Sequence, residues 1–296
     1  MRAPDVQISR PEKVLIPPGI TKRQLADYYE RVAESMLAHI ASRPLNLERY
    51  PDGIDGERIM QQRAGRYFPA WIARVEVRAE KGDVEHVMAR DAATLVYLAG
   101  QACITLHPWL SRSDRLDRPD RLVIDLDPSR EDLDEVRRAA RLIGEIFREL
   151  QLQPWVMTSG SRGYHVVIAL RRRADFGAVR GFARGLAELA ERRHPDLFTT
   201  EQRKAKRDGR ILIDVMRNAY AHTSVAPYAV RARPDGPVAT PLHWAELDDP
   251  QTHPQRWTVA TVPARLDRSG DPWRNLAKKA TSLTAARGRL KQALAA

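Results

Sequence analysis

The sequence predicts an α+β fold centred on a βαββαβ sheet, and three observations lead to it. Four short segments rich in branched apolar residues, each bounded by Gly, Pro or polar turns, have the composition of strands. Two longer segments with apolar residues at helical spacing lie between the first and second strands and between the third and fourth. Gly160 and Gly163 separate the middle two strands, as in a tight turn. This is the order of a ferredoxin-like, or RRM-like, sheet, which supports many unrelated functions.

Local signals give the boundaries of the individual elements. Thr21 and Gln24 form a capping box, and apolar residues then recur at helical spacing toward Pro44, which predicts a helix of about 20 residues. Ser129 and Asp132 form a second capping box ahead of the next helix. The further expected helices run over 131–151 and 175–194, and the expected strands over 121–127, 154–159, 164–170 and 211–216.

We expect a single domain over 1–296, in which an α/β module (1–110) packs on the core (111–235) and a C-terminal segment (236–296) follows. A chain of this length can bury a large core without covalent staples. The single cysteine, Cys103, excludes a disulfide framework and a zinc site built on several thiolates. No apolar run is long enough to span a membrane, and the N-terminus has no signal-peptide core, so we expect a cytoplasmic protein.

The positive charge of the chain is clustered. The formal net charge is +11, and the window 162–210 holds 13 Lys and Arg against 6 Asp and Glu. Such a cluster attracts polyanions, and each phosphate contact on a nucleic acid adds favourable counterion release. A solvated basic helix face is the alternative interpretation, and charge by itself does not separate the two.

Three aspartates lie on otherwise apolar predicted strands. Asp125 and Asp127 share one face of the segment RLVIDLD because side chains alternate along a strand. Asp214 is expected in the middle of the strand ILIDVM. The first and last strands of a βαββαβ unit share a sheet, so the three carboxylates are expected to meet on one face.

Carboxylates this close raise each other's pKa, and a divalent cation removes that cost. Oxygen ligands favour Mg²⁺ or Mn²⁺ over zinc, and such ions beside a basic surface indicate phosphoryl transfer on a nucleic acid. The alternative is structural: Asp125 and Asp127 cap the helix that follows, and Asp214 has a similar role.

The turn TSGSRGYHV (158–166) offers backbone and hydroxyl donors together with Arg162 and His165, which suit phosphate oxygens. Glycine-rich hairpins without function are common, so this motif depends on its position beside the acidic strand. His107, on the apolar segment CITLHPW, is by itself more typical of a satisfied core residue than of a ligand.

Several motifs together resemble a known family. VIDLDP, SGSRGYH, LIDVMRN and VRAR (230–233) resemble, in this order, the polymerase domain of the bacterial end-joining ligase LigD, in the archaeo-eukaryotic primase superfamily. PEKVLIPPGITK and RPLNLERYPDGID resemble its opening elements, so the match covers most of the chain. The resemblance implies a primase-like catalytic core with a palm-like sheet. It also implies a DNA-dependent polymerase of gaps or broken ends that uses two divalent metals, Mn²⁺ preferred, and leans toward ribonucleotides, in a bacterial, nucleoid-associated setting.

The resemblance also assigns roles by position. Asp125, Asp127 and Asp214 match the metal-binding catalytic acids. The expected nucleotide-binding residues are His107, Ser159, Arg162, His165, Arg207, Arg217 and Arg231, and the expected residues for a downstream 5′-phosphate are Arg10, Lys13 and Lys22.

The chain departs from the family at a few positions. Arg10 stands where many members have Asn, and Glu48 stands where many have a basic residue. Met60 and Gln61 occupy the place of a Phe pair that stacks on the template, and they cannot stack as aromatic rings do.

The expected partners are gapped or broken double-stranded DNA and NTP or dNTP, with no membrane. The chain has no room for a ligase or nuclease domain, so we expect a stand-alone polymerase, or an excised domain, that works with a separate ATP-dependent ligase and Ku. Two rival functions remain. A metal-dependent nuclease or phosphodiesterase would use water as the attacker, and a non-catalytic RRM-like module would present aromatics, where this sequence has acids.

Overall fold

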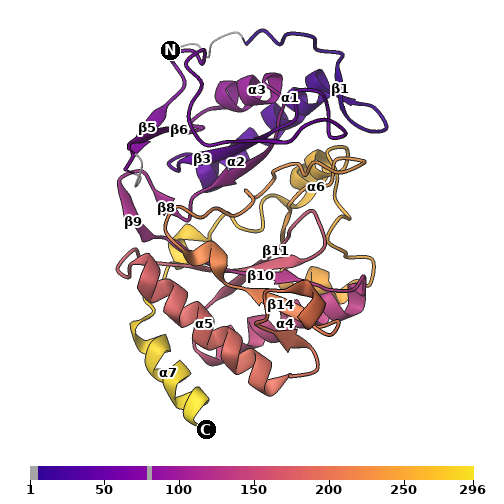
Figure 1. The fold of residues 1–296 in the computed structure, drawn as a ribbon. Coiled ribbons are helices and arrows are strands. Elements are labelled where there is room, and N and C mark those ends of the chain that lie inside the picture. The colour runs from indigo at the N-terminus through magenta and orange to yellow at the C-terminus, as the bar shows by residue number, and fades with distance from the viewer. Residues whose placement is uncertain (1–5, 79–81) are drawn as a thin grey trace. The chain divides into compact units, whose positions relative to one another are not determined.

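The computed structural model describes residues 6–78 and 82–296, so residues 1–5 and 79–81 of the predicted N-terminal module lie outside it (Figure 1). The chain forms two compact units whose segments interleave along the sequence. Unit 1 comprises Met1–Asp114, Thr223–Thr240 and Trp257–Asp271, and unit 2 comprises Arg115–His222, Pro241–Arg256 and Pro272–Ala296. Within the described residues, no helix is both long and apolar enough to cross a bilayer.

Unit 2 contains a six-stranded sheet in the order β13-β14-β10-β12-β11-β15. Its four central strands have the order that the βαββαβ chain predicts, and each is antiparallel to its neighbours among the four. The α+β prediction is therefore confirmed. The elements of unit 2 are β9 (Arg115–Pro119), β10 (Arg121–Asp127), α4 (Leu133–Glu149), β11 (Pro154–Thr158), β12 (Tyr164–Ala169), α5 (Phe176–Arg193), β13 (Phe198–Thr199), η1 (Lys204–Lys206), β14 (Ile211–Asp214), η2 (Met216–Asn218), β15 (Pro241–Leu242), η3 (Trp244–Asp248), η4 (Ala277–Lys279) and α7 (Thr284–Ala295).

Helices α4 and α5 pack on one face of this sheet and on each other, and α7 lies along α5 (Figure 1). Leu122, Ile124 and Leu126 of β10 are completely buried. Burying a side chain of this size stabilises the fold by about 1.5–3 kcal/mol. Alternation along β10 therefore places Asp125 and Asp127 on the opposite face, where both are only partly buried.

Unit 1 is a second α/β layer. Its sheet has the order β4-β3-β6-β5, with β7 also paired to β3, and its helices α1, α2 and α3 pack on one another. The elements of unit 1 are β1 (Val14–Ile16), β2 (Ile20–Thr21), α1 (Lys22–Arg31), α2 (Ala33–Ile40), β3 (Leu45–Arg49), β4 (Ile59–Gln61), β5 (Arg74–Val77), β6 (Val84–Val87), α3 (Ala92–Gly100), β7 (Cys103–Pro108), β8 (Ser111–Arg112) and α6 (Val262–Ser269).

Three sequence expectations differ from the structure in detail. The expected 20-residue helix is interrupted at Val32, a β-branched residue whose ψ of 2° lies outside the helical range. Helix α4 has Asp132 as its N-cap, because the Asp132 carboxylate accepts the backbone N–H of Glu135, while Ser129 donates its hydroxyl to the Arg210 carbonyl. Asp214 is the last residue of β14 and does not lie in its middle.

Candidate active site

The strand register brings the three predicted acids together. Asp125 of β10 is paired directly with Asp214 of β14, and Asp127 lies two residues further along β10. Directly paired residues on antiparallel strands project to the same face, with α-carbons about 4.5–5.5 Å apart. The three carboxylates therefore share one sheet face, as the alternation along the two strands predicts.

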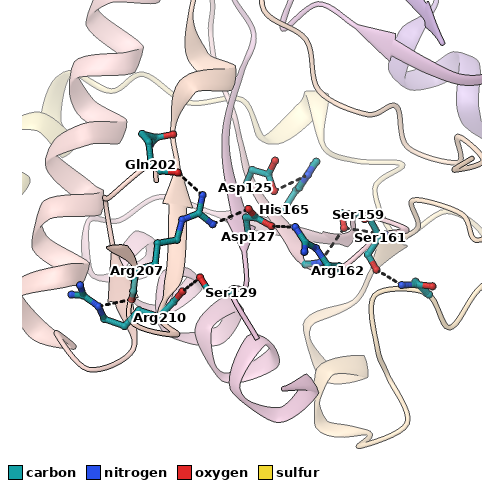
Figure 2. A network of polar contacts seen from close by, with 12 residues as sticks. Asp125, Asp127, Ser129, Ser159, Ser161, Arg162, His165, Gln202, Arg207 and Arg210 are labelled. Atoms are coloured by element: carbon teal, nitrogen blue, oxygen red, sulfur yellow. Dashed lines mark hydrogen bonds and ion pairs between the residues drawn. The ribbon is translucent and has the colours of Figure 1, made fainter. Parts of the chain in front are cut away.

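Asp127 is held by two arginines from different segments (Figure 2). Arg162 of the β11–β12 loop donates to Asp127 Oδ1 over 3.1 Å, and Arg207, which follows η1, donates to Asp127 Oδ2 over 3.0 Å. The Arg207 side chain is only 7% exposed and also donates to the carbonyls of Glu201 and Gln202. Arg207 is therefore a fixed part of the site, whereas Arg162, at 41% exposed, is free to reach solvent.

Asp125 is held by His165 and Arg217. His165 Nε2 lies 3.3 Å from Asp125 Oδ1, and Arg217 Nε lies 3.4 Å from Asp125 Oδ2. Burial by itself would raise the pKa of Asp125, but the charge and hydrogen bond of His165, followed by those of Arg217, outweigh it and hold that pKa well below its usual range. Asp125 is therefore an ionised carboxylate throughout the neutral pH range.

Asp214 has a structural contact of its own in the turn after β14, whereas Asp125 and Asp127 have no capping role at α4. Helix α4 is capped by Asp132, so Asp125 and Asp127 do not cap it. Asp214 Oδ1 accepts the backbone N–H of Met216 over 2.7 Å, while its Oδ2 lies 3.9 Å from Arg217 Nε. Asp214 thus shapes the turn into η2 and keeps one oxygen on the side of the other acids.

The acids have the donor chemistry of a site for hard divalent cations. All three offer carboxylate oxygens on one face, and oxygen ligands suit Mg²⁺ and Mn²⁺. Within residues 6–78 and 82–296, no three acidic, His or Cys side chains are already gathered around one point as a metal would need. The carboxylates instead face cations, so an incoming metal ion would replace guanidinium groups as their partner.

The turn after β11 lies tightly against β10. The Ser159 hydroxyl accepts the backbone N–H groups of Ser161 and Gly163, both over 3.2 Å, and so closes the turn from inside. A side chain at Gly163 would overlap the carbonyl oxygen of Leu126, which lies between the two acids of β10. The absence of a side chain at Gly163 therefore lets the turn bring Arg162 and His165 to the acids.

Two site residues escaped the sequence analysis. Asn218 of η2 is completely buried and ties the segment after β14 to β10, since its amide bonds to the backbone N–H and C=O of Val123 and to the carbonyl of Val215. This contact holds η2 against β10 two residues before Asp125. Gln255 donates to the Ser161 carbonyl over 2.7 Å and lines a pocket of about 270 Å³ beside Arg162. The only sequence signal for Asn218 is its place in LIDVMRN, and Gln255 has none.

His107 and Arg231, predicted near the nucleotide, belong to unit 1. His107 Nε2 lies 2.8 Å from Glu48 Oε2, and the Tyr50 hydroxyl donates to Glu48 Oε1 over 2.9 Å. Burial opposes ionisation of Glu48, but the hydrogen bond and charge of His107, then Tyr50, then the charge of Arg231, lower the pKa of Glu48 to about 2. The acid that replaces a basic residue of the family thus lies in a compensating cationic setting.

The pairing of Glu48 with His107 predicts that unit 1 is less stable at acidic pH. The pKa of Glu48 is about 2 in the folded protein, against an ordinary value of 4.5. The stability that ionised Glu48 contributes is therefore fully present when the pH is above 4.5, and it is lost as the pH falls toward 2. We expect the free energy of unfolding to decrease by about 3 kcal/mol between about pH 5 and pH 2 through this group. Urea unfolding at several pH values should show a flatter dependence for Glu48→Gln, whereas the exposed control Glu57→Gln should follow the unchanged chain. Equal slopes in all three proteins would contradict the assignment.

The three cations expected at a 5′-phosphate also gather within unit 1. Burial lowers the pKa of Lys22, and the nearby charges of Lys13 and Arg10 lower it further. Lys22 donates to the Ser9 carbonyl over 3.1 Å, and Lys13 pairs with the exposed Asp52 over 2.7 Å. Arg10 has a φ of 49°, a left-handed conformation that asparagine adopts more readily than arginine.

The positions of the missing Phe pair lie on β4. Met60 is 42% exposed, and the Gln61 side chain accepts from Arg49 and donates to the Arg63 carbonyl. Neither side chain offers a flat aromatic ring on which a base could stack.

Comparisons with known proteins identify the family of the chain. Residues 21–273 match the family described as LigD, primase-polymerase domain. The chain is 34% identical over 286 residues to the multifunctional non-homologous end joining protein LigD of Pseudomonas aeruginosa, which covers 95% of this chain and 34% of that protein. It is 29% identical over 274 residues to the bifunctional LigD of Bacillus subtilis, covering 91% of this chain and 44% of that protein. The chain therefore spans between a third and a half of these relatives.

A solved structure gives the same answer for the fold. The polymerase domain of Mycobacterium tuberculosis ligase D, determined in complex with DNA, superposes with a TM-score of 0.87 at 30% identity, covering 94% of this chain and 99% of that one. Domains of this kind are metal-dependent polymerases. The chain therefore belongs to the LigD primase-polymerase family and is a nucleotidyltransferase of the DNA polymerase type.

Proposed function

We propose that this protein adds nucleotides, with ribonucleotides preferred, to a primer 3′-hydroxyl at gaps or broken ends of double-stranded DNA. The observation that carries the proposal is the direct pairing of Asp125 with Asp214, with Asp127 two residues away on the same face. This arrangement supports a two-metal reaction because two hard cations need several carboxylates on one surface.

Asp125, Asp127 and Asp214 would hold two Mn²⁺ or Mg²⁺ ions. When bound, such ions activate an attacking hydroxyl and neutralise the charge of a departing pyrophosphate. The chain itself keeps Asp125 ionised through His165 and Arg217. It also ties the segment after Asp214 to β10 through Asn218.

The arginines that now pair with the acids are suited to the triphosphate. Arg162 is paired with Asp127, which would help to hold a metal ion, and its side chain is exposed enough to turn toward an incoming phosphate. Guanidinium groups form paired hydrogen bonds with phosphate oxygens. The further proposed nucleotide-binding residues are Ser159, His165, Arg207 and Arg217 in unit 2, and His107 and Arg231 in unit 1.

The proposed substrate is DNA with a downstream 5′-phosphate. Arg10, Lys13 and Lys22 form a cationic group in unit 1 that suits a phosphate, and the solved relative was determined with DNA. The proposed setting is repair by end joining or gap filling, with a separate ATP-dependent ligase and Ku as partners, since the named relatives are end-joining proteins.

Extension of a gapped duplex tests the proposal. We expect synthesis to be faster with Mn²⁺ than with Mg²⁺, faster with NTPs than with dNTPs, and faster when the downstream strand carries a 5′-phosphate. Lys13→Gln should remove most of the advantage given by the 5′-phosphate, and its ion pair with the exposed Asp52 contributes little to stability. Metal-dependent shortening of the primer without synthesis would instead support the phosphodiesterase alternative.

A further inference from the structure

Unit 2 contains a second concentration of positive charge, away from the acids. A basin of about 560 Å³ is lined by Arg115, Asp117, Arg118, Arg171, Arg172 and Arg173. Five guanidinium groups and one carboxylate give it a formal charge of +4. Concave surfaces lined by one sign of charge focus the field and concentrate counter-ions.

The basin is held in shape by backbone contacts. Arg118 donates to the carbonyl of Arg173 over 3.0 Å, which ties β9 to the segment after β12. Arg171 donates through Nε to the carbonyl of Ala280 over 3.0 Å, which ties the same segment to the C-terminal part of unit 2. These contacts involve carbonyl groups, so they position the arginines without neutralising them.

Part of the positive charge of the basin has no compensating carboxylate. Arg118 pairs with Asp117 over 3.0 Å, and both groups are substantially exposed. Within the part of the chain that the structure describes, the side chains of Arg115 and Arg173 make no hydrogen bond or ion pair, and both residues are exposed. Cations this close repel one another in the absence of an anion, so the fold maintains a local repulsion that a polyanion would relieve.

The basin lies at the opposite end of the strands from the acids. On β10 and β12, Asp125 is paired with His165, whereas Arg121 is paired with Ala169. The four-residue step along β10 from Asp125 back to Arg121 spans about 13 Å, and the basin lies beyond Arg121. This distance equals about four base-pair steps of duplex DNA at 3.4 Å each. A ligand of the basin is therefore remote from the reacting end.

We propose that the basin binds the phosphodiester backbone of DNA at a point several base pairs from the site of nucleotide addition. The inference rests on the proposed function only in taking DNA as the polyanion. It deepens that function by giving the enzyme a second contact on its substrate, whose effect depends on the length of the DNA. Arginine suits this role because its planar group pairs with phosphate oxygens in any base sequence.

Binding of a short and a long duplex to the full chain, measured by fluorescence anisotropy over a range of salt, tests the proposal. For Arg115→Gln/Arg173→Gln we expect about tenfold weaker binding of the long duplex, and a slope of log K against log salt that is smaller by about 1 to 2. Binding of a short duplex, confined to the acidic end, should be unchanged. Asp117→Asn should tighten binding of the long duplex, an effect that misfolding cannot produce.

A charge-matched control is available on the helices of unit 2. Arg138 and Arg184 are exposed on α4 and α5, so Arg138→Gln/Arg184→Gln removes the same charge from elsewhere. An equal loss of affinity in this control, or an unchanged affinity and salt slope in the basin variant, would overturn the proposal. The proposal would also be overturned if the basin variant lost binding of tripolyphosphate while its binding of DNA stayed unchanged. The basin would then be a site for free phosphates. Because the experiment measures DNA binding, its result can be distinguished from a failure of the protein to add nucleotides.

Discussion

Asparagine at position 125 is expected to reduce nucleotide addition by about a thousandfold or more, because a metal ligand is worth several kcal/mol and each 1.36 kcal/mol is tenfold in rate. The exchange preserves the shape of the side chain and removes its charge. The affinity for DNA should not fall, since one negative charge near the phosphates is lost. Primer extension on a gapped duplex and anisotropy on the same duplex measure the two effects separately.

The same exchange at the other two acids separates catalysis from capping. Asp127→Asn should behave like Asp125→Asn. Asp214→Asn keeps an oxygen that can accept the Met216 N–H, so a purely structural Asp214 would tolerate it, whereas a metal ligand would not. Asp208→Asn is the matched control, because Asp208 is 82% exposed and has a φ of 51°, which asparagine adopts readily. Synthesis within tenfold of the unchanged chain in the Asp125 or Asp127 variant would place the catalytic centre elsewhere.

The sheet and the shared face of the acids were predictable because both depend on local rules. Alternation along β10 places Asp125 and Asp127 on the face opposite the apolar residues, independently of the rest of the chain. The order of four central strands follows from two helices of sufficient length and one tight turn at Gly160. Family resemblance then supplied what these rules cannot, namely the polymerase activity.

The partners of the acids were not predictable from local rules. Arg207 reaches Asp127 from a segment 80 residues away, and Asn218 reaches Val123 across 95 residues. Such contacts depend on how the loops close, which neither periodicity nor capping signals record. The capping box predicted at Ser129 was likewise wrong: the Asp132 carboxylate caps α4, while the Ser129 hydroxyl donates to the carbonyl of Arg210.

Membership of the two units also escapes local analysis. The segments Thr223–Thr240 and Trp257–Asp271 belong to unit 1. In the sequence, however, the core strands of unit 2 separate them from the N-terminal part of unit 1. Arg231 joins Glu48 and His107 through this return of the chain. Only pairing between distant segments decides such an arrangement.

Alanine at position 163 is expected to damage both the stability and the activity of unit 2. The added methyl group would meet the carbonyl oxygen of Leu126, a backbone atom that cannot rotate away. The turn must then move off β10, so we expect the free energy of unfolding to fall by about 1–3 kcal/mol, as for other overpacked sites. The displaced Arg162 and His165 should slow nucleotide addition by about a hundredfold, the effect of a 1 Å misplacement.

Gly181 provides the matched control, because it lies in α5 with no atom within 4 Å of an added methyl group. Gly181→Ala should raise the free energy of unfolding by about 0.5–1 kcal/mol, since alanine loses less backbone entropy in a helix. Urea unfolding of both variants measures the change in stability, and primer extension measures the change in activity. The opposite signs are the critical result, because one substitution is chemically identical to the other and only the approach of the turn to Leu126 distinguishes them. A Gly163→Ala protein as stable and active as the unchanged chain would show that the turn does not need to lie against β10.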